Sequence, residues 1–398
     1  MSIIGIGEDG ISGLSKSACQ RIEDAEHIFG GERHLELAAD LIKGTNHPWP
    51  VPFDSSMKDV LALRGQKVCV LASGDPFFYG VGTTLLRHID PAETITIPVP
   101  SSVSLAASRL GWPLQDTDIV ALHGRSLDQV RPLLFDHNRI FALSEGSDTP
   151  SRIASLLTEN GFRHSRLTVL EALGGAHERI RHTTAESFDL QDIHSLNIVA
   201  LEIHTETDAR IIPLCHGLED RLFEHDGQIT KREIRALTLS ALAPRKGELL
   251  WDIGAGSGSI AIEWLLADKS LKAIAIEADA GRLERIRHNA ASFGVPSLQT
   301  IHGNAPDSLQ GLSQPDAIFI GGGGSDPDVM DTALHALKPG GRLVANAVTL
   351  EMEFLLLNCH KRFGGALSRF EIMRASAIGS MTGWRPAMPI TQWIWTKS

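Results

Sequence analysis

A glycine-rich turn in the second half of the chain has residue types that suit a nucleoside site. An apolar strand predicted over residues 249–253 runs into a Gly-x-Gly-x-Gly turn at residues 254–258, and a helix over residues 260–267 follows at once. Glycines let a ligand approach the backbone closely, and the first turn of a helix offers free N–H groups. Glu277 ends the next predicted strand, where a carboxylate can accept both ribose hydroxyls. The turn therefore predicts a nucleoside-binding site, the alternative being a turn that only closes a strand–helix–strand unit.

Two features of this turn favour S-adenosylmethionine over a dinucleotide. A dinucleotide fingerprint has the spacing Gly-x-Gly-x-x-Gly, whereas Ser259 stands at the last of those positions here. Asp252 precedes the turn, where it would repel a pyrophosphate and suit a cationic group. S-adenosylmethionine carries a sulfonium and an ammonium and no phosphate. A nicotinamide- or flavin-dependent oxidoreductase that uses the same turn is the alternative.

Two more segments follow later strands of the same unit. Asn304 and Ala305 come after the third predicted strand, at the level where an adenine ring would lie. Four consecutive glycines, residues 321–324, end the fourth strand. Ordering four glycines costs conformational entropy, so the run indicates close passage of a bulky ligand or a mobile lid. A plain flexible loop is an equal alternative.

Three loops in the first half carry a second set of candidate binding residues. A glycine-spaced loop at residues 6–13 follows the first predicted strand, although many such loops are simple turns. Residues 72–82 join a buried strand to a helix through Gly74 and Asp75, and place Phe78 beside the chain's single tyrosine. Aromatic side chains next to exposed backbone amides suit a flat apolar ligand. Residues 101–104 begin the next helix with serines, for which helix capping is the alternative function.

Short apolar runs that alternate with helical patterns predict two α/β units with mainly parallel sheets. Strands are expected in the first unit at residues 3–7, 68–72, 94–97, 140–143, 167–170 and 197–203. In the second they are expected at residues 249–253, 273–276, 298–301, 317–320 and 343–346, with a helix over 279–293. A polar stretch over residues 205–226 separates the units, so we predict domains over residues 1–205 and 206–398.

The second unit is expected to open with a helix that begins at a capping box. Thr230 and Glu233 have capping-box spacing. Ile234, Leu237 and Ala241 then fall on one face, which we expect to be buried.

Composition excludes several classes of function. The net charge of −11 and the single tyrosine argue against nucleic-acid binding, which needs cationic surface and stacking platforms. The four cysteines are widely separated, which argues against a zinc knuckle or a disulfide scaffold and suits the cytoplasm. No apolar run reaches the roughly 20 residues that span a bilayer, so we expect no membrane partner. No pair among the 17 histidines has ligand spacing supported by context, so we also expect no metal site.

The motifs of the first unit resemble those of the tetrapyrrole methylases, whose S-adenosylmethionine lies folded between two α/β lobes. This resemblance is carried by residues 4–10, 73–77, 101–106 and 122–125, with further support at 171–175 and 178–180. The second unit resembles a class I methyltransferase, with more specific matches at residues 226–233, 346–351 and 382–389. In this order the two units are similar to the fused methyltransferases of cobalamin biosynthesis, over essentially the whole chain.

The resemblance implies an enzyme that methylates carbons 5 and 15 of precorrin-6Y and removes carbon dioxide from an acetate side chain. It implies a two-lobed tetrapyrrole methylase fold followed by a class I Rossmann-like domain, with one S-adenosylmethionine site in each. The N-terminal domain would methylate carbon 5, and the C-terminal domain would decarboxylate and methylate carbon 15. A homo-oligomer is expected because related domains often assemble. The rival interpretation is that one half is catalytically silent and only binds tetrapyrrole.

Carried over position by position, the resemblance implies cofactor contacts in both domains. In the second domain they are Thr230, Gly254, Ala255, Gly256, Ser257, Gly258, Glu277 and Ala305. Asn304 stands where class I enzymes commonly have aspartate, and its amide oxygen can still accept one bond from adenine. In the first domain the implied contacts are Gly74, Asp75, Phe78 and Ser102.

Catalysis of this kind depends mainly on positioning. Methyl transfer to carbon is an in-line displacement at an activated sulfonium, which needs no strong base, and the tetrapyrrole itself can accept the electrons that decarboxylation releases. An acidic chain must bind the substrate carboxylates through local cations, for which Lys231, Arg385 and Arg125 are the candidates and surface solvation is the alternative. Glu351 is expected near the reacting side chain.

Overall fold

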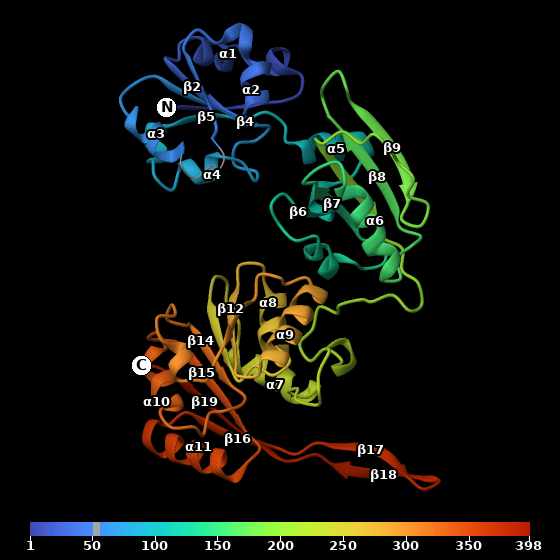
Figure 1. Cartoon of the computed structure of the whole chain (residues 1–398), viewed down its shortest axis with the longest axis vertical. Helices are drawn as coiled ribbons and strands as arrows, with labels where there is room; N and C mark the ends of the chain where they lie inside the picture. Colours follow the sequence, from blue (N-terminus) through green and yellow to red (C-terminus); the bar gives the residue numbers. More distant parts are fainter. Residues whose placement is uncertain (51–55) are drawn as a thin grey trace. The chain divides into compact units, whose positions relative to one another are not determined.

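The computed structural model describes residues 1–50 and 56–398, and its contacts divide the chain into two units (Figure 1). The first unit comprises residues 1–127 and 133–210, and the second comprises residues 128–132 and 211–398. Part of the polar stretch belongs to the second unit, because Ile212, Leu218 and Phe223 are buried in its core. None of the described helices is long and apolar enough to cross a membrane.

The first sheet of the first unit is entirely parallel. Its strands are β1 (Ser2–Ile6), β2 (His27–Gly30), β3 (Thr45–Pro48), β4 (Val68–Ser73) and β5 (Ile95–Ile97), in the order β3-β2-β4-β1-β5. Its helices are α1 (Lys16–Glu23), α2 (Glu32–Leu37), α3 (Ser56–Ala62) and α4 (Gly82–Leu85). The central β1 and β4 are almost wholly buried, which is typical of strands in a parallel sheet. Strand β3 was not predicted, because its four residues are polar or proline and none is buried.

The second sheet of this unit is mainly antiparallel, so the prediction of mainly parallel strands was wrong here. Its strands are β6 (Asp118–Ala121), β7 (Arg139–Leu143), β8 (Arg166–Glu171), β9 (Arg179–Thr184) and β10 (Asn197–Glu202). The order is β6-β7-β10-β8-β9, and only β6 and β7 run parallel. The short connection from β8 to β9 permits only antiparallel pairing, because a parallel pair needs a long crossover. Two helices, α5 (Ser102–Leu110) and α6 (Thr149–Glu159), belong to this lobe.

The second unit is built on a seven-stranded, mainly parallel sheet. Its strands are β11 (Leu249–Ile253), β12 (Lys272–Glu277), β13 (Gln299–His302), β14 (Ala317–Ile320), β15 (Arg342–Ala347), β16 (Ala366–Phe370) and β19 (Ile390–Thr396). The order is β13-β12-β11-β14-β15-β19-β16, with β19 antiparallel to both of its neighbours. A separate two-stranded hairpin, β17 (Met373–Ile378) and β18 (Met381–Pro386), extends from this sheet (Figure 1).

Helices cover both faces of this sheet and create two cores. The helices are α7 (Arg232–Leu242), α8 (Ser259–Ala267), α9 (Ala280–Ser292), α10 (Val329–Ala336) and α11 (Leu350–Phe363). Side chains of α7, α8 and α9 pack with Leu250 and Phe319, whereas those of α10 and α11 pack with Trp251 and Ile318. Because successive residues of a strand point to opposite faces, both faces of these strands are apolar and both are buried. This arrangement leaves the strand ends as the place for polar ligand groups.

The start of α7 differs from the predicted capping box. The N-cap is Lys231, without a side-chain cap hydrogen bond, and the Glu233 carboxylate pairs with Arg374 instead. Leu237 is 40% exposed, whereas Ile234 and Leu239 are buried, so the predicted apolar face was partly wrong. Arg235 on α7 is fully buried, so the buried face of this helix includes a charged residue that the apolar pattern does not mark.

Candidate functional site

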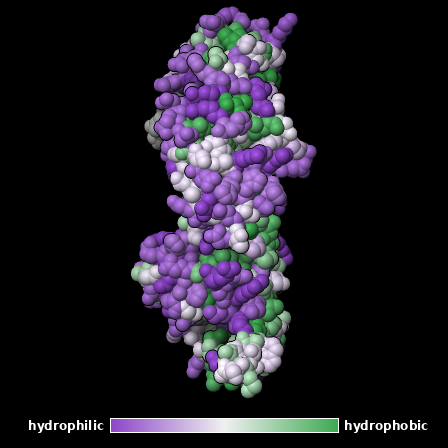
Figure 2. Space-filling model, turned by 90° about the vertical axis from the view of Figure 1, so that its right-hand side faces the viewer, coloured by the Kyte–Doolittle hydropathy of each residue, from purple (hydrophilic) through white to green (hydrophobic). Residues whose placement is uncertain are grey.

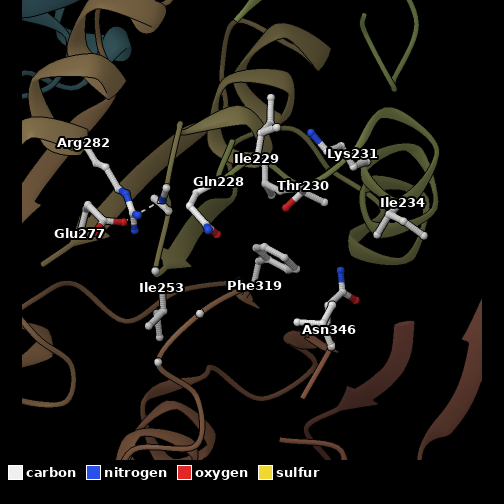
Figure 3. Close-up of a pocket in the computed structure, with 18 of the residues that line it drawn as sticks. Gln228, Ile229, Thr230, Lys231, Ile234, Ile253, Glu277, Arg282, Phe319 and Asn346 are labelled. Carbon is white, nitrogen blue, oxygen red and sulfur yellow. Dashed lines mark hydrogen bonds between the residues drawn. The ribbon is translucent and has the colours of Figure 1, made fainter. Parts of the chain in front are cut away.

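A cavity of about 620 Å³ opens at the carboxyl ends of the parallel strands of the second unit (Figure 3). Residues that follow β11, β12, β13, β14 and β15 line it, which is where open α/β sheets bind ligands. Its volume lies within the roughly 300–1,000 Å³ of small-molecule sites. Figure 3 shows Glu277 and Arg282 on one side of the cavity and Thr230, Lys231 and Asn346 on the other.

Glu277 is held against the glycine turn by two backbone hydrogen bonds. Its carboxylate accepts from the N–H of Gly256 at 2.8 Å and from that of Asp279 at 3.0 Å, and the residue is 6% exposed. Gly254 has a left-handed backbone with φ of 70°, and a Cβ there would lie 2.5 Å from the carbonyl oxygen of Gly322. Only glycine permits this approach of two strand ends. The turn therefore presents Gly254, Ala255 and Gly256 to the cavity with a fixed carboxylate beside them.

The rest of the turn faces the interior of the unit. Ser257 is 1% exposed, and its carbonyl accepts from Asn289 at 2.9 Å. Gly258 lies against Ile286, so that a Cβ there would come within 2.8 Å of that side chain. Neither Ser257 nor Gly258 is among the residues that line the cavity.

Asp252 is turned toward α8 and away from the cavity, contrary to the expectation that it faces a cationic ligand group. Its carboxylate accepts from the N–H of Ala261 at 3.1 Å, and the residue is 1% exposed. Burial raises the pKa of Asp252 to about 7. The side chain is thus placed to influence the stability of the turn and not to contact a cofactor.

A buried ion pair holds the segment that carries Thr230 and Lys231, both of which line the cavity. Arg235 is fully buried and donates to Glu263 at 2.5 Å and to the Thr230 carbonyl at 2.6 Å. Glu263 also accepts from the backbone N–H groups of residues 217 and 218, at 2.7 and 2.9 Å. Sequence analysis missed this pair, because an arginine and a glutamate on two different helices form no recognisable pattern. Its place on α7 also explains why the buried face of that helix differs from the prediction.

Asn304 and Ala305 line the cavity together with Gly303, in the segment that follows β13. The main-chain carbonyl of Asn304 accepts from the backbone N–H of Ser308 at 3.0 Å, which closes the turn behind its exposed side chain. Of the four consecutive glycines, residues 321–323 line the cavity, whereas Gly324 packs against Ile320 and Met352. The glycine run therefore forms a wall of the cavity, which favours close passage of a ligand over a plain loop.

A polar network fixes Asn346 at the other side of the cavity. Its amide donates to the Thr238 hydroxyl at 2.9 Å and accepts from the Gln392 amide at 2.9 Å. Thr238 and Gln392 are both buried. The cavity wall continues through Ile372 and Arg374 at the base of the hairpin. Sequence analysis included Asn346 in the motif at residues 346–351 but could not assign it a role, because its partners come from α7 and β19.

The three predicted catalytic residues are not brought together. Lys231 lines the cavity, and its ammonium lies 3.9 Å from an Asp220 carboxylate oxygen. Arg385 is exposed on β18, opposite Arg374, and it is Arg374 that lines the cavity. Glu351 is exposed in the first turn of α11 and lies outside the lining. Because residues 374 and 385 are both arginines on paired strands, residue type could not indicate which of them lines the cavity.

A second cavity, of about 450 Å³, is lined by residues from both lobes of the first unit. Asp75 and Phe78 line it from the loop after β4, and Leu114 and Ile119 line it from the second lobe. Gly74 lies behind this lining with φ of 57°, and a Cβ there would meet Ser101 at 3.0 Å. The predicted loop residues are thus close together, with Gly74 serving the packing of two loops.

At the start of α5, Ser101 lines this cavity and Ser102 does not. Ser101 is the N-cap and accepts from the N–H of Ser104 at 3.2 Å, whereas Ser102 is exposed. The guanidinium of Arg125 lies 5.7 Å from the centre of the Tyr79 ring, and both side chains are exposed. This contact places the predicted cation beside the aromatic loop.

Residues 1–189 match the family model of the tetrapyrrole (corrin/porphyrin) methylases, and residues 221–397 match that of the precorrin methyltransferase domain. The chain is 59% identical over 397 residues to a precorrin-6Y C(5,15)-methyltransferase [decarboxylating] of Sinorhizobium sp, covering 100% of this chain and 96% of the relative. Two shorter relatives match parts of the chain. A probable cobalt-precorrin-6B C(15)-methyltransferase (decarboxylating) of Saccharolobus solfataricus is 38% identical over 37% of this chain and 77% of the relative. A cobalt-precorrin-7 C(5)-methyltransferase of Salmonella typhimurium is 28% identical over 45% of this chain and 88% of the relative.

Proposed function

The chain belongs to the decarboxylating precorrin-6Y C5,15-methyltransferases of cobalamin biosynthesis, and from this premise we propose that each of its units binds one S-adenosylmethionine and performs one methylation. The observation that carries the proposal is the presence of one cavity at the expected loops of each unit. S-adenosylmethionine supplies the activated methyl group when bound.

In the second unit the nucleoside would lie beside Glu277. The Glu277 carboxylate is already ordered by two N–H groups, and its remaining acceptor capacity is available for ribose hydroxyls. Asn304 and Ala305 would contact adenine, and Gly254, Ala255, Gly256 and Thr230 would contact the amino-acid portion. Ser257 and Gly258 would act by shaping the turn, since both face the interior.

In the first unit we assign Asp75, Phe78 and Ser101 to the cofactor cavity. Gly74 would allow the loops to pack closely, and Ser102 lies outside the lining. The substrate would lie beside Tyr79 and Arg125, where an aromatic face and a cation meet. Both properties suit a macrocycle with carboxylate side chains.

We assign carbon 5 to the first unit and decarboxylation with carbon 15 to the second. The two shorter relatives support this division, because their names separate a C(5) activity from a decarboxylating C(15) activity. The match of the first unit to the tetrapyrrole methylases agrees with the same assignment.

Substrate carboxylates in the second unit would bind Lys231 and Arg374, two cations that line the cavity. Asn346, fixed by Thr238 and Gln392, would hold the reacting edge of the macrocycle. In decarboxylation the bond to the carboxyl carbon breaks, the electron pair passes into the macrocycle, and the macrocycle takes up a proton. The protein's part is to orient the side chain so that this bond overlaps the ring system.

The test is mass spectrometry of the product formed from precorrin-6Y and S-adenosylmethionine, combined with a count of bound cofactor. The unmodified chain should bind two equivalents and yield two methyl groups with loss of carbon dioxide. Glu277→Ala and Ser104→Trp, which fills the first cavity, should each retain one equivalent. A chain that binds one equivalent and still performs both methylations would contradict the proposal.

We further propose that the protein self-associates through the β17–β18 hairpin. Ile378, Met381, Trp384 and Met388 on and beside this hairpin are 58–74% exposed, and Figure 2 shows pale and green surface at the end of the molecule where it lies. An isolated two-stranded hairpin is marginal in water, and an apolar one gains stability when a second copy covers it. Trp384→Lys should lower the mass measured by light scattering, whereas Leu214→Lys, at an 87% exposed leucine outside the hairpin, should not.

A further inference from the structure

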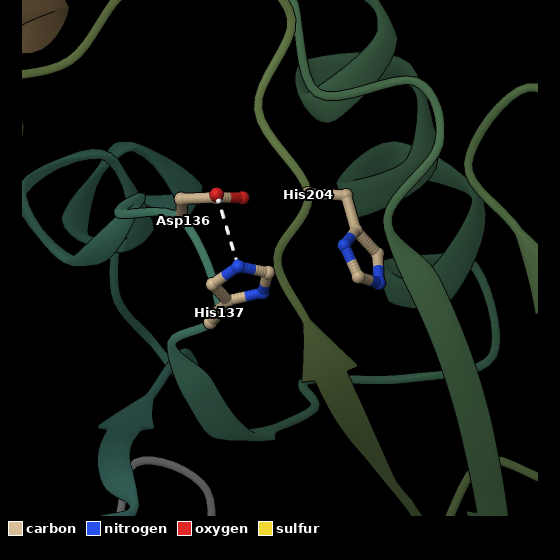
Figure 4. Close-up of side chains that lie close together, drawn as sticks. All are labelled: Asp136, His137 and His204. Carbon is tan, nitrogen blue, oxygen red and sulfur yellow. Dashed lines mark ion pairs between the residues drawn. The ribbon is translucent and has the colours of Figure 1, made fainter.

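Three potential metal ligands converge on the surface of the first unit. Asp136, His137 and His204 each offer one ligand atom, and these atoms lie within 4.8 Å of one another (Figure 4). His137 Nε2 lies 3.3 Å from Asp136 Oδ2. That separation is close to the about 3.3 Å between ligand atoms of a tetrahedral ion with bonds of about 2.0 Å.

The fold brings these residues together from distant parts of the sequence. Asp136 and His137 precede β7, His204 follows β10, and the two strands pair antiparallel with Glu202 opposite Arg139. The ends that carry the three side chains therefore lie side by side. Figure 4 shows Asp136 beside His137 with His204 to their right, and the centres of the two imidazole rings lie 5.9 Å apart.

Backbone hydrogen bonds fix the positions of the two histidines. The N–H of His137 donates to the carbonyl of Ile203 at 2.9 Å, and that of His204 donates to the Ser165 hydroxyl at 3.0 Å. His137 has φ of 61°, a left-handed conformation that few residues other than glycine adopt, so the surrounding contacts must hold it there.

The donor atoms are available and carry suitable charge. Thr205 N–H donates to Asp136 Oδ1 at 3.0 Å, which leaves Oδ2 toward His137. Within residues 1–50 and 56–398, the ring nitrogens of His204 make no hydrogen bond, so either can bind an ion.

We propose that Asp136, His137 and His204 form a binding site for a divalent transition metal ion of the zinc class. Two imidazole nitrogens and one carboxylate oxygen are ligands that such ions prefer, and exposure leaves the remaining positions to water. A bound ion would tie the turn before β7 to the segment after β10. Because the second unit begins at residue 211, it would anchor the chain where it leaves the first unit.

Zinc titration of the full-length chain tests the site. Cys215 is exposed and is followed by His216, so Cys215→Ser serves as the parent for all variants to remove a competing ligand. The parent should bind one Zn²⁺ in isothermal titration, and the ion should raise its thermal midpoint as a native-state ligand does. His204→Ala should weaken binding by at least about tenfold, the lower end of what loss of an outer-shell partner alone costs.

The matched control is His164→Ala, because His164 is also exposed and lies beside two carboxylates, those of Glu186 and Glu206. It should leave zinc affinity unchanged. Asp136→Asn tests the carboxylate without changing the size of the side chain. Equal zinc affinity in the parent and in His204→Ala, with both chains folded by circular dichroism, would overturn the proposal.

Discussion

The two cavities to which we assign S-adenosylmethionine are built in different ways. In the second unit one continuous segment supplies the glycine turn, and the next strand end supplies Glu277, tied to Gly256 by a 2.8 Å hydrogen bond. In the first unit the cavity is assembled from the loop after β4, the segment over residues 98–104 that leads into α5, and Leu114 and Ile119. A site formed by a contiguous segment tolerates substitutions in other loops, whereas a site formed by several loops depends on how those loops pack.

A motif locates each cavity but does not indicate which of its residues face inward. In the second unit the motif places the cavity correctly but does not tell which of its residues face inward, as Ser257 and Gly258 show. In the first unit the predicted loops lie at the cavity, but Ser101 lines it and Ser102 does not.

The greatest loss of stability is expected when the buried Arg235 of the second unit is replaced. Arg235→Met leaves Glu263 buried without its partner, which should cost about 3–5 kcal/mol of unfolding free energy. It should also release Thr230 and abolish cofactor binding in that unit. Urea unfolding with a probe in each unit measures this. Adding Glu263→Gln should restore part of the stability, and a loss equally large in the first unit would contradict the account.

Glu277→Gln should weaken S-adenosylmethionine binding in the second unit about 10- to 100-fold, because a charged acceptor is replaced by a neutral one. Binding in the first unit should not change, which titration calorimetry can resolve as one weakened site of two. The control is Glu284→Gln, at an exposed glutamate of α9 that pairs with Arg287. Weakening of both sites would mean that the cavities are coupled.

Stability of the second unit should depend on pH through Asp252. The folded unit keeps the Asp252 proton up to about pH 7, whereas the unfolded chain loses it near the ordinary value of 3.8. The unfolded state therefore binds fewer protons between these values, and the unfolding free energy falls as pH rises from about 4 to 7. Asp252→Asn should remove this slope. Chemical unfolding at pH 5 and 8 measures it, and an unchanged slope in the variant would refute the assignment.

Two adjacent serines test the assembled site. Ser101→Ala should cost about 1 kcal/mol because α5 loses its N-cap, and cofactor binding in the first unit should weaken several-fold. Ser102→Ala changes an exposed neighbour and should do neither. Weaker cofactor binding in Ser102→Ala than in Ser101→Ala would instead support Ser102, the residue implied by the sequence, as the cofactor contact.

Small effects are expected at Glu351 and Arg385, which the sequence predicts to lie beside the substrate. Glu351→Gln and Arg385→Ala alter exposed side chains outside the cavity lining, so each should change the decarboxylation rate less than about twofold. Arg374→Ala alters a lining residue and should raise the KM for precorrin-6Y, which neither exposed variant should do. Full loss of decarboxylation in Glu351→Gln would return that carboxylate to the mechanism.

Much of the fold could be predicted because strong apolar periods dictate it. Observed β11, β12 and β14 agree within one residue with the predicted strands, and α9 agrees with the predicted helix because Asp279 caps it. Strands with little apolar signal were missed, among them β3, β9 and the hairpin. The pairing direction of β8 and β10 also could not be predicted, since buried strands look alike in either kind of sheet.

The two-unit organisation, the family and the place of the glycine turn could be read from sequence, because apolar periods and glycine spacing are local properties. Which residues meet across the fold depends on tertiary structure. It paired Arg235 with Glu263, fixed Asn346 between Thr238 and Gln392, and brought His137 to His204 across paired strands. Such contacts join residues far apart in the chain, and their energies depend on burial and direction that no local pattern records.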